Sequence, residues 1–199
     1  MNNKIALLFF FLLLQGSFFA QTDSSIHGRW TVKASAALTQ TGRYKLIGDS
    51  GLDPVYTPNY RLEASYGFKK NMELGLYIGS NKHEGVIVTY YKEYTKQIGI
   101  TFNYHILPLI YKNKSLPIDF YLTARYGGVI LTKQKESKYY GFNSEYGAGI
   151  GVNYFFLKKF GIYADYLIGD FNFRTASFPE EDELLRDFNK IRVGFVVKF

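Results

Sequence analysis

The dominant pattern along this chain is a strict alternation of apolar and polar residues. The clearest case is the segment 190–199, KIRVGFVVKF, whose alternate apolar positions are Ile191, Val193, Phe195, Val197 and Phe199. A period of two is the pattern of a β-strand with one apolar face. The same pattern occurs at 29–38, 60–68, 72–79, 97–106, 119–126, 145–154 and 160–169. The chain is therefore predicted to be all-β, with eight strands.

The second face of these strands mixes charged residues with glycines. The glycines include Gly67, Gly75, Gly99, Gly147, Gly149, Gly151, Gly161 and Gly194. Glycine weakens a strand and often marks a close approach, so this face suits the crowded lumen of a narrow barrel. The apolar face would then contact lipid, where an open sheet edge is not tolerated. We predict an eight-stranded antiparallel up-and-down transmembrane β-barrel.

The connections between the predicted strands alternate in length. Short ones lie at 69–71, 107–117 and 155–159, and long ones at about 39–58, 80–96, 129–144 and 170–188. In outer-membrane barrels the short turns are periplasmic and the long loops extracellular. Aromatic residues are expected to form girdles at both ends. The lower girdle would comprise Trp30, Phe68, Tyr104, Phe120, Tyr154, Phe160 and Phe199, and the upper one Tyr60, Tyr126, Tyr146 and Tyr166.

The first twenty residues are predicted to be a signal peptide, and residues 21–199 the barrel domain. Lys4 precedes an apolar run from Ile5 to Leu14, and small or polar residues lead to Ala20. This run is shorter than the roughly 20 residues of a spanning helix. The chain has no cysteine, which excludes disulfides, and a net charge of +7. For an exported protein this charge favours anionic lipid over nucleic acid as a partner.

Charged residues on the second face are expected to point into the lumen. They are Arg29, Lys33, Arg61, Glu63, Glu73, Asp119, Arg125, Glu145, Asp165, Lys190 and Arg192. Opposite charges should pair there, because isolated buried charges are costly. An eight-stranded interior is just wide enough for side chains to fill it, which favours a salt-bridged plug. The alternative is a narrow pore for ions or small solutes.

With these features the chain resembles the small outer-membrane β-barrel proteins of Gram-negative bacteria, the group of the OmpA N-terminal domain and OmpX. In that family the last strand carries a targeting signal of a polar residue, a glycine and alternating hydrophobic residues up to a terminal aromatic. Arg192, Gly194, Val197 and Phe199 match it. The resemblance implies an outer-membrane location and recognition of the last strand by the envelope assembly machinery. It also implies contact with outer-membrane lipids and lipopolysaccharide.

Some barrels of this size are enzymes that act on lipid A, and such a hydrolase needs a serine activated by a histidine. His27 precedes the first predicted strand, His83 lies in a long loop near Ser80, and His105 ends the fourth strand. His105 is followed by Ile106 and Leu107 and so lacks a His-x-Ser pattern. We therefore predict no catalytic, cofactor-binding or metal-binding residues, and lipid A modification is the weakest alternative.

The long loops are the best candidates for function. Segment 82–97 is rich in tyrosine and still alternates, so the adjoining strands would continue beyond the membrane and offer an edge to a partner strand. Segment 131–143 carries Lys133, Lys135 and Lys138 and could contact lipopolysaccharide phosphates. Segment 177–188 is acidic, and a solvated loop is favoured there over a cation site. The predicted role is structural, adhesive or surface-interacting.

Overall fold

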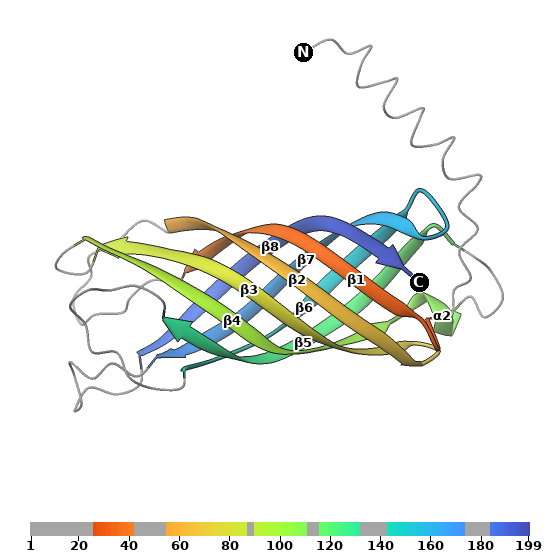
Figure 1. Cartoon of the computed structure of the whole chain (residues 1–199), viewed down its shortest axis with the longest axis horizontal. Helices are drawn as coiled ribbons and strands as arrows, with labels where there is room; N and C mark the ends of the chain where they lie inside the picture. Colours follow the sequence, from red (N-terminus) through yellow and green to blue (C-terminus); the bar gives the residue numbers. More distant parts are fainter. Residues whose placement is uncertain (1–25, 42–54, 87–89, 111–115, 132–142, 174–183) are drawn as a thin grey trace, which may run out of the picture.

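The chain folds into a closed barrel of eight strands (Figure 1). The computed structural model describes residues 26–41, 55–86, 90–110, 116–131, 143–173 and 184–199. The strands are β1 (Trp30–Thr41), β2 (Val55–Lys69), β3 (Met72–Val86), β4 (Tyr90–His105), β5 (Ile118–Leu131), β6 (Asn143–Phe155), β7 (Phe160–Phe173) and β8 (Leu184–Lys198). Each strand pairs antiparallel with the next, and β8 pairs antiparallel with β1. The predicted fold class is confirmed.

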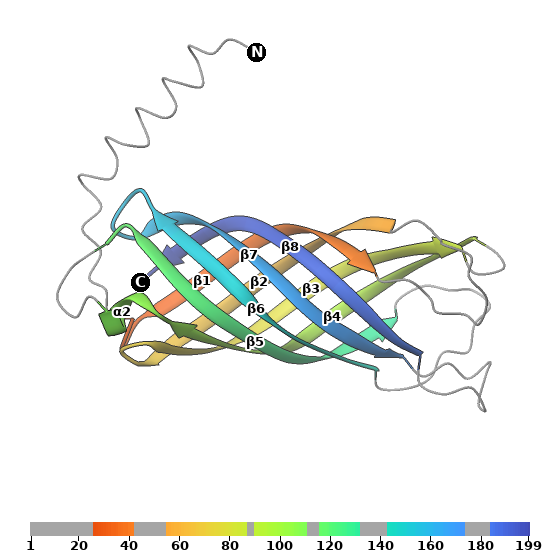
Figure 2. The same cartoon turned by 180° about the vertical axis from the view of Figure 1, so that it is seen from behind.

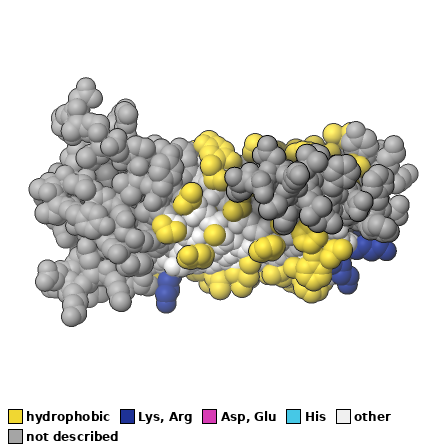
Figure 3. All heavy atoms as spheres, turned by 90° about the horizontal axis from the view of Figure 1, so that it is seen from above, with side chains coloured by type: hydrophobic (Ala, Val, Ile, Leu, Met, Phe, Trp, Pro, Cys, Tyr) yellow, Lys and Arg dark blue, Asp and Glu magenta, His cyan; other side chains and the backbone are white. Residues whose placement is uncertain are grey.

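The barrel wall is apolar outside and polar inside. Exposed residues of the wall include Leu62, Leu76, Ile100, Ile150 and Phe195, whereas most of the buried residues are polar or charged. Figure 3 shows hydrophobic side chains spread over the described part of the wall. This arrangement is typical of barrels that stand in an outer membrane. Among the described residues, no helix has the length and hydropathy to cross a membrane.

Strand β4 shows the limits of the apolar face. Its outward-facing residues run from the exposed Lys96 through Ile98 and Ile100 to the half-buried Tyr104. A lysine and a tyrosine are side chains that reach the polar boundary of a bilayer while their apolar parts stay on the wall. Ile100 therefore lies near the midplane of the bilayer.

We expect Ile100→Arg to lower the free energy of unfolding by about 2–4 kcal/mol, because a charged side chain on the lipid face is most costly at the midplane. Urea unfolding of the barrel in phosphatidylcholine vesicles measures this loss. The matched control is Lys96→Arg, which keeps a cation at the boundary and should change stability by no more than about 0.5 kcal/mol. Equal losses for the two variants would contradict this placement of the wall in the membrane.

The strands are longer than predicted at the upper end of the barrel. The structure adds residues to both strands of each hairpin there, so segment 80–96 is largely strand, and backbone pairing runs to Val86↔Tyr90. The predicted limits were too short because they followed the apolar face that contacts lipid, whereas backbone pairing does not need lipid. The expected extension of the strands around segment 82–97 is confirmed.

The connections at the lower end are short. The turn between β2 and β3 contains residues 70–71, and that between β6 and β7 contains residues 156–159. The predicted connection 107–117 contains the four-residue helix α2 (Leu107–Ile110). Figures 1 and 2 show these connections at the same end as the C-terminus. Residues 1–25, 132–142 and 174–183 lie outside the described residues, and with them the predicted signal peptide and most of segments 131–143 and 177–188.

Candidate functional site in the barrel lumen

The charged residues of the second face meet inside the barrel. Of the eleven predicted lumen charges, ten are buried, and only Arg29, which precedes β1, is half-buried. Lys198 and His105 are buried there as well. Six buried Lys and Arg residues face five buried Asp and Glu residues, so the described lumen is nearly balanced in charge. We call this group the lumen network.

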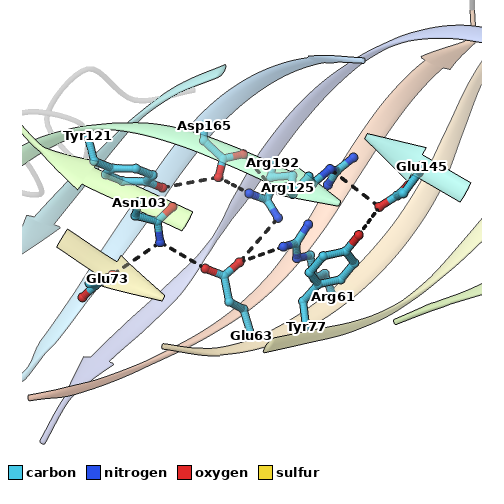
Figure 4. A network of polar contacts seen from close by, with 10 residues as sticks. All are labelled: Arg61, Glu63, Glu73, Tyr77, Asn103, Tyr121, Arg125, Glu145, Asp165 and Arg192. Carbon is cyan, nitrogen blue, oxygen red and sulfur yellow. Dashed lines mark hydrogen bonds and ion pairs between the residues drawn. The ribbon is translucent and has the colours of Figure 1, made fainter. Parts of the chain in front are cut away.

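The centre of the lumen network is Arg192, which is 2% exposed. Its Nε donates to Asp165 Oδ1 at 2.6 Å, and its second terminal nitrogen also donates to this carboxylate. Glu63 lies between two guanidinium groups, 3.9 Å from Arg192 and 3.1 Å from Arg61 (Figure 4). A bidentate arginine–carboxylate pair is the strongest ordinary ion pair in a protein. This pair joins β7 to β8 at positions that are directly opposite in the register.

Above this centre, Glu145 contacts polar side chains from three other strands. Tyr77 Oη donates to Oε1 at 2.8 Å, and Gln97 Nε2 donates to Oε2 at 2.5 Å. Arg125 Nε lies 3.6 Å from the same carboxylate. Tyr77 is on β3 and Glu145 on β6, which are not neighbours in the barrel, so this contact crosses the lumen. The carboxylate of Glu145 therefore accepts hydrogen bonds from β3 and β4 and forms an ion pair with β5.

Below the centre, His105 lies between two carboxylates. Its Nδ1 is 2.7 Å from Asp119 Oδ2, and its Nε2 is 3.3 Å from Glu73 Oε2. Asn103 links this lower part to the centre, because its Nδ2 is 3.3 Å from both Glu63 and Glu73. With Lys33 of β1, the buried charges and their donors come from all eight strands. The lumen network therefore ties every strand to the others and fixes the register.

Two large buried tyrosine rings lie among the charges of the lumen. The guanidinium carbon of Arg61 lies 3.6 Å from the centre of the Tyr77 ring, and Lys33 Nζ lies 4.0 Å from that of Tyr121. A side chain at Gly151 would collide with the Tyr121 ring, and one at Gly99 would collide with Tyr77 and with backbone. Gly151 and Gly99 therefore leave room for these two rings, which agrees with the crowded lumen expected from the sequence. The filling role of these two tyrosines was not predicted, although their position on the glycine-rich face was the available signal.

The residues considered for catalysis do not come together. His27 is exposed before β1, Ser80 faces outward on β3, and His83 pairs with Glu93 in the backbone register of β3 and β4. His105 has a carboxylate at each ring nitrogen and belongs to the lumen network. In the described part of the chain, no group of His, Asp or Glu residues is arranged to hold a metal ion.

Comparison with known protein families identifies the family of this chain. The model of the outer membrane protein beta-barrel domain matches residues 9–199, and the chain belongs to this family. The protein is therefore an outer-membrane β-barrel. No curated protein matches the sequence.

Solved structures with the same fold include three small barrels. Neisserial surface protein A (NspA) is 17% identical with a TM-score of 0.63, and the match covers 87% of this chain and 100% of that one. OprG from Pseudomonas aeruginosa is 11% identical with a TM-score of 0.54, covering 88% and 97%. Ail, the attachment invasion locus protein of Yersinia pestis, is 12% identical with a TM-score of 0.52, covering 87% and 99%. At these identities the comparisons show a shared fold.

Proposed function

We propose that this barrel is a non-enzymatic outer-membrane protein that binds partners at the cell surface through its extracellular end. The observation that carries the proposal is the filled lumen. Buried charges lie at three levels of the lumen, around Glu145, Arg192 and His105. The contacts Tyr77–Glu145, Arg192–Glu63 and Asn103–Glu63 join strands that are not neighbours in the barrel. A lumen closed in this way leaves the outer end of the barrel as the place of function.

The hairpin of β3 and β4 supports this proposal. Pairing between β2 and β3 stops at Asn59↔Asn81, and pairing between β4 and β5 stops at Thr95↔Leu131. Residues 82–86 and 90–94 pair only with each other among the described residues, and we call them the β3–β4 ribbon. The ribbon extends beyond the closed barrel at the left of Figure 1. Such edges offer unpaired backbone groups to an added strand.

The proposal agrees with what two of the similar structures are called, a surface protein and an attachment protein. We further propose contact with outer-membrane lipids and lipopolysaccharide, and recognition of β8 by the envelope assembly machinery. The position of His105 between two carboxylates supports a non-enzymatic role, because neither ring nitrogen is left to activate a nucleophile.

Removal of the ribbon tests the proposed surface role. Asn81 and Thr95 are directly opposite in the register, so replacing residues 82–94 with Asn-Gly closes the hairpin with a two-residue turn. We expect cells that display this variant to lose most of their adhesion to immobilised extracellular-matrix proteins and to cells that carry the intact protein. Adhesion is measured at equal surface levels of barrel.

The control is the shift in gel migration on boiling, which should be the same for both proteins because the closed part of the barrel is unchanged. Unchanged adhesion on every surface would contradict a role of the ribbon. In planar bilayers, a reproducible conductance step of the intact protein would favour the pore alternative. A change in lipid A acylation that depends on the protein would favour the enzyme alternative.

A further inference from the structure

An apolar trough crosses the outer wall of the barrel from β5 to β1. Its floor is a row of small side chains that are directly opposite one another in the register, namely Val152, Ala164, Val193 and Ala36. The row above the floor consists of bulky side chains, namely Ile150, Tyr166, Ile191 and Leu38. The row below is bulky except at its last residue and consists of Tyr154, Ile162, Phe195 and Ala34. Two hollows that share Val152 and Ala164 follow this floor. Figure 2 shows β5 to β8 from this side.

The trough opens at the periplasmic rim. Its row continues from Val152 to Phe120 of β5, whose carbonyl accepts the backbone N–H of Ile106 at 2.9 Å. Ile106 directly precedes helix α2, whose residues Leu107 and Ile110 line the lower hollow. The strands of such barrels are tilted, so a row across them slopes along the wall toward one rim. The trough therefore lies in the half of the wall that faces the periplasmic leaflet.

The dimensions of the trough fit a single hydrocarbon chain. From β6 to β1 the floor crosses three strand spacings, which is about 14 Å at about 4.8 Å each and enough for most of an extended acyl chain. The floor is one row of outward side chains wide, about 7 Å along a strand. A helix with its side chains is about 10–12 Å across and does not fit. An acyl chain is therefore the occupant that this shape selects.

The charges at the rim indicate which lipid. The exposed charged side chains described at this rim are all lysines, and they form two pairs. Lys69 and Lys70 lie at the end of β2 and in the turn that follows it, and Lys158 and Lys159 lie in the turn between β6 and β7. The acids of this end, such as Asp119, are buried in the lumen. The Lys158–Lys159 pair is on the turn that joins the two strands carrying Val152 and Ala164. Each lysine near a membrane surface attracts anionic lipid by about 1 kcal/mol.

We propose that the trough holds an acyl chain of an anionic phospholipid whose phosphate is bound by Lys158 and Lys159. The backbone holds this turn in place, because Lys198 N–H donates to the Lys159 carbonyl at 2.7 Å and Leu157 N–H to that of Phe160 at 3.1 Å. The site depends on the membrane location of the barrel and not on the proposed extracellular role. It selects a lipid of the periplasmic leaflet by shape and charge together.

Fluorescence quenching by brominated lipids tests this site. The protein has one tryptophan, Trp30, so Trp30→Phe with Phe195→Trp places a single fluorophore at the edge of the trough. The control is Trp30→Phe with Leu76→Trp on β3, where the exposed fraction is 66% against 67% for Phe195. Both are reconstituted in phosphatidylcholine vesicles that contain equal mole fractions of brominated phosphatidylglycerol or brominated phosphatidylcholine. For the tryptophan at position 195, we expect the association constant obtained from quenching to be at least about fivefold higher for phosphatidylglycerol than for phosphatidylcholine.

Three further variants separate a built site from general attraction to a basic protein. Lys158→Gln with Lys159→Gln should abolish the preference at Phe195→Trp, whereas Lys69→Gln with Lys70→Gln should leave it. Ala164→Phe fills the floor of the trough and should also abolish it, although all four lysines remain. Gel migration before and after boiling shows that each variant is folded. Equal quenching by the two lipids at Phe195→Trp, the same preference at Leu76→Trp, or equal effects of the two lysine pairs would each overturn the proposal.

Discussion

Arg192→Met is expected to lower the free energy of unfolding by about 3–5 kcal/mol, the usual cost of removing one partner of a buried ion pair. The variant leaves the Asp165 carboxylate buried with a weaker donor, since Tyr121 Oη is 3.3 Å away. Glu63 keeps Arg61 at 3.1 Å, so the loss falls mainly on Asp165. Methionine preserves most of the volume of the side chain, and the effect is therefore one of charge and hydrogen bonding.

The measurement is urea unfolding in phosphatidylcholine vesicles, followed by the fluorescence of Trp30, which is exposed at the lower rim. Adding Asp165→Val to Arg192→Met should recover much of the loss, because an apolar pair leaves no buried charge behind. Arg29→Met, at a half-buried arginine outside the strands, is the matched control and should cost no more than about 1 kcal/mol. A loss for Arg192→Met as small as that of the control would mean that water reaches Asp165, and the pore alternative would then gain support.

His105→Leu is expected to cost about 3 kcal/mol, because it leaves the carboxylates of Asp119 and Glu73 buried without the imidazole between them. This cost is at the lower end of the range of about 3–5 kcal/mol for breaking a buried ion pair, because neutral donors to both carboxylates remain. Thr31 Oγ1 donates to Glu73 at 2.7 Å, and Asn153 Nδ2 donates to Asp119 at 3.0 Å. The same unfolding assay measures the loss.

His27→Leu is the matched control for this second variant, since His27 is exposed before β1. It should change the free energy of unfolding by no more than about 0.5 kcal/mol. Adding Asp119→Asn to His105→Leu removes one of the two stranded charges and should restore part of the stability. If the two leucine variants unfold at the same urea concentration, His105 does not hold the lower part of the lumen network together.

Much of the barrel could be predicted because alternation is a local property. Along β8 and Phe199, the residues from Lys190 onward alternate between lumen and lipid as the period of two predicts, and Val196 is buried on the lumen side although it is apolar. The limits of the strands could not be predicted in this way. Beyond the bilayer an apolar face is no longer required, and although segment 82–97 still alternates, no change in its pattern marks where pairing ends.

The lumen charges could be assigned to the interior but not to their partners. Asp165 and Arg192 are directly opposite in the register, so their pairing follows once the last hairpin is aligned. Glu145 and Tyr77 lie on β6 and β3, which are not neighbours in the barrel. Their contact depends on how far each strand is shifted along the barrel before it closes, and no local pattern records that shift.

The sequence by itself determined the class of this protein, because every second residue of each strand had to suit lipid or a crowded lumen. It determined the strand count, the inverted polarity and the identity of most of the buried charges for the same reason. The tertiary structure decided which charges meet across the lumen, how far the β3–β4 ribbon stands beyond the wall, and that Val152, Ala164, Val193 and Ala36 form one row. These features depend on the register of eight strands around a closed barrel, which only the complete set of pairings defines.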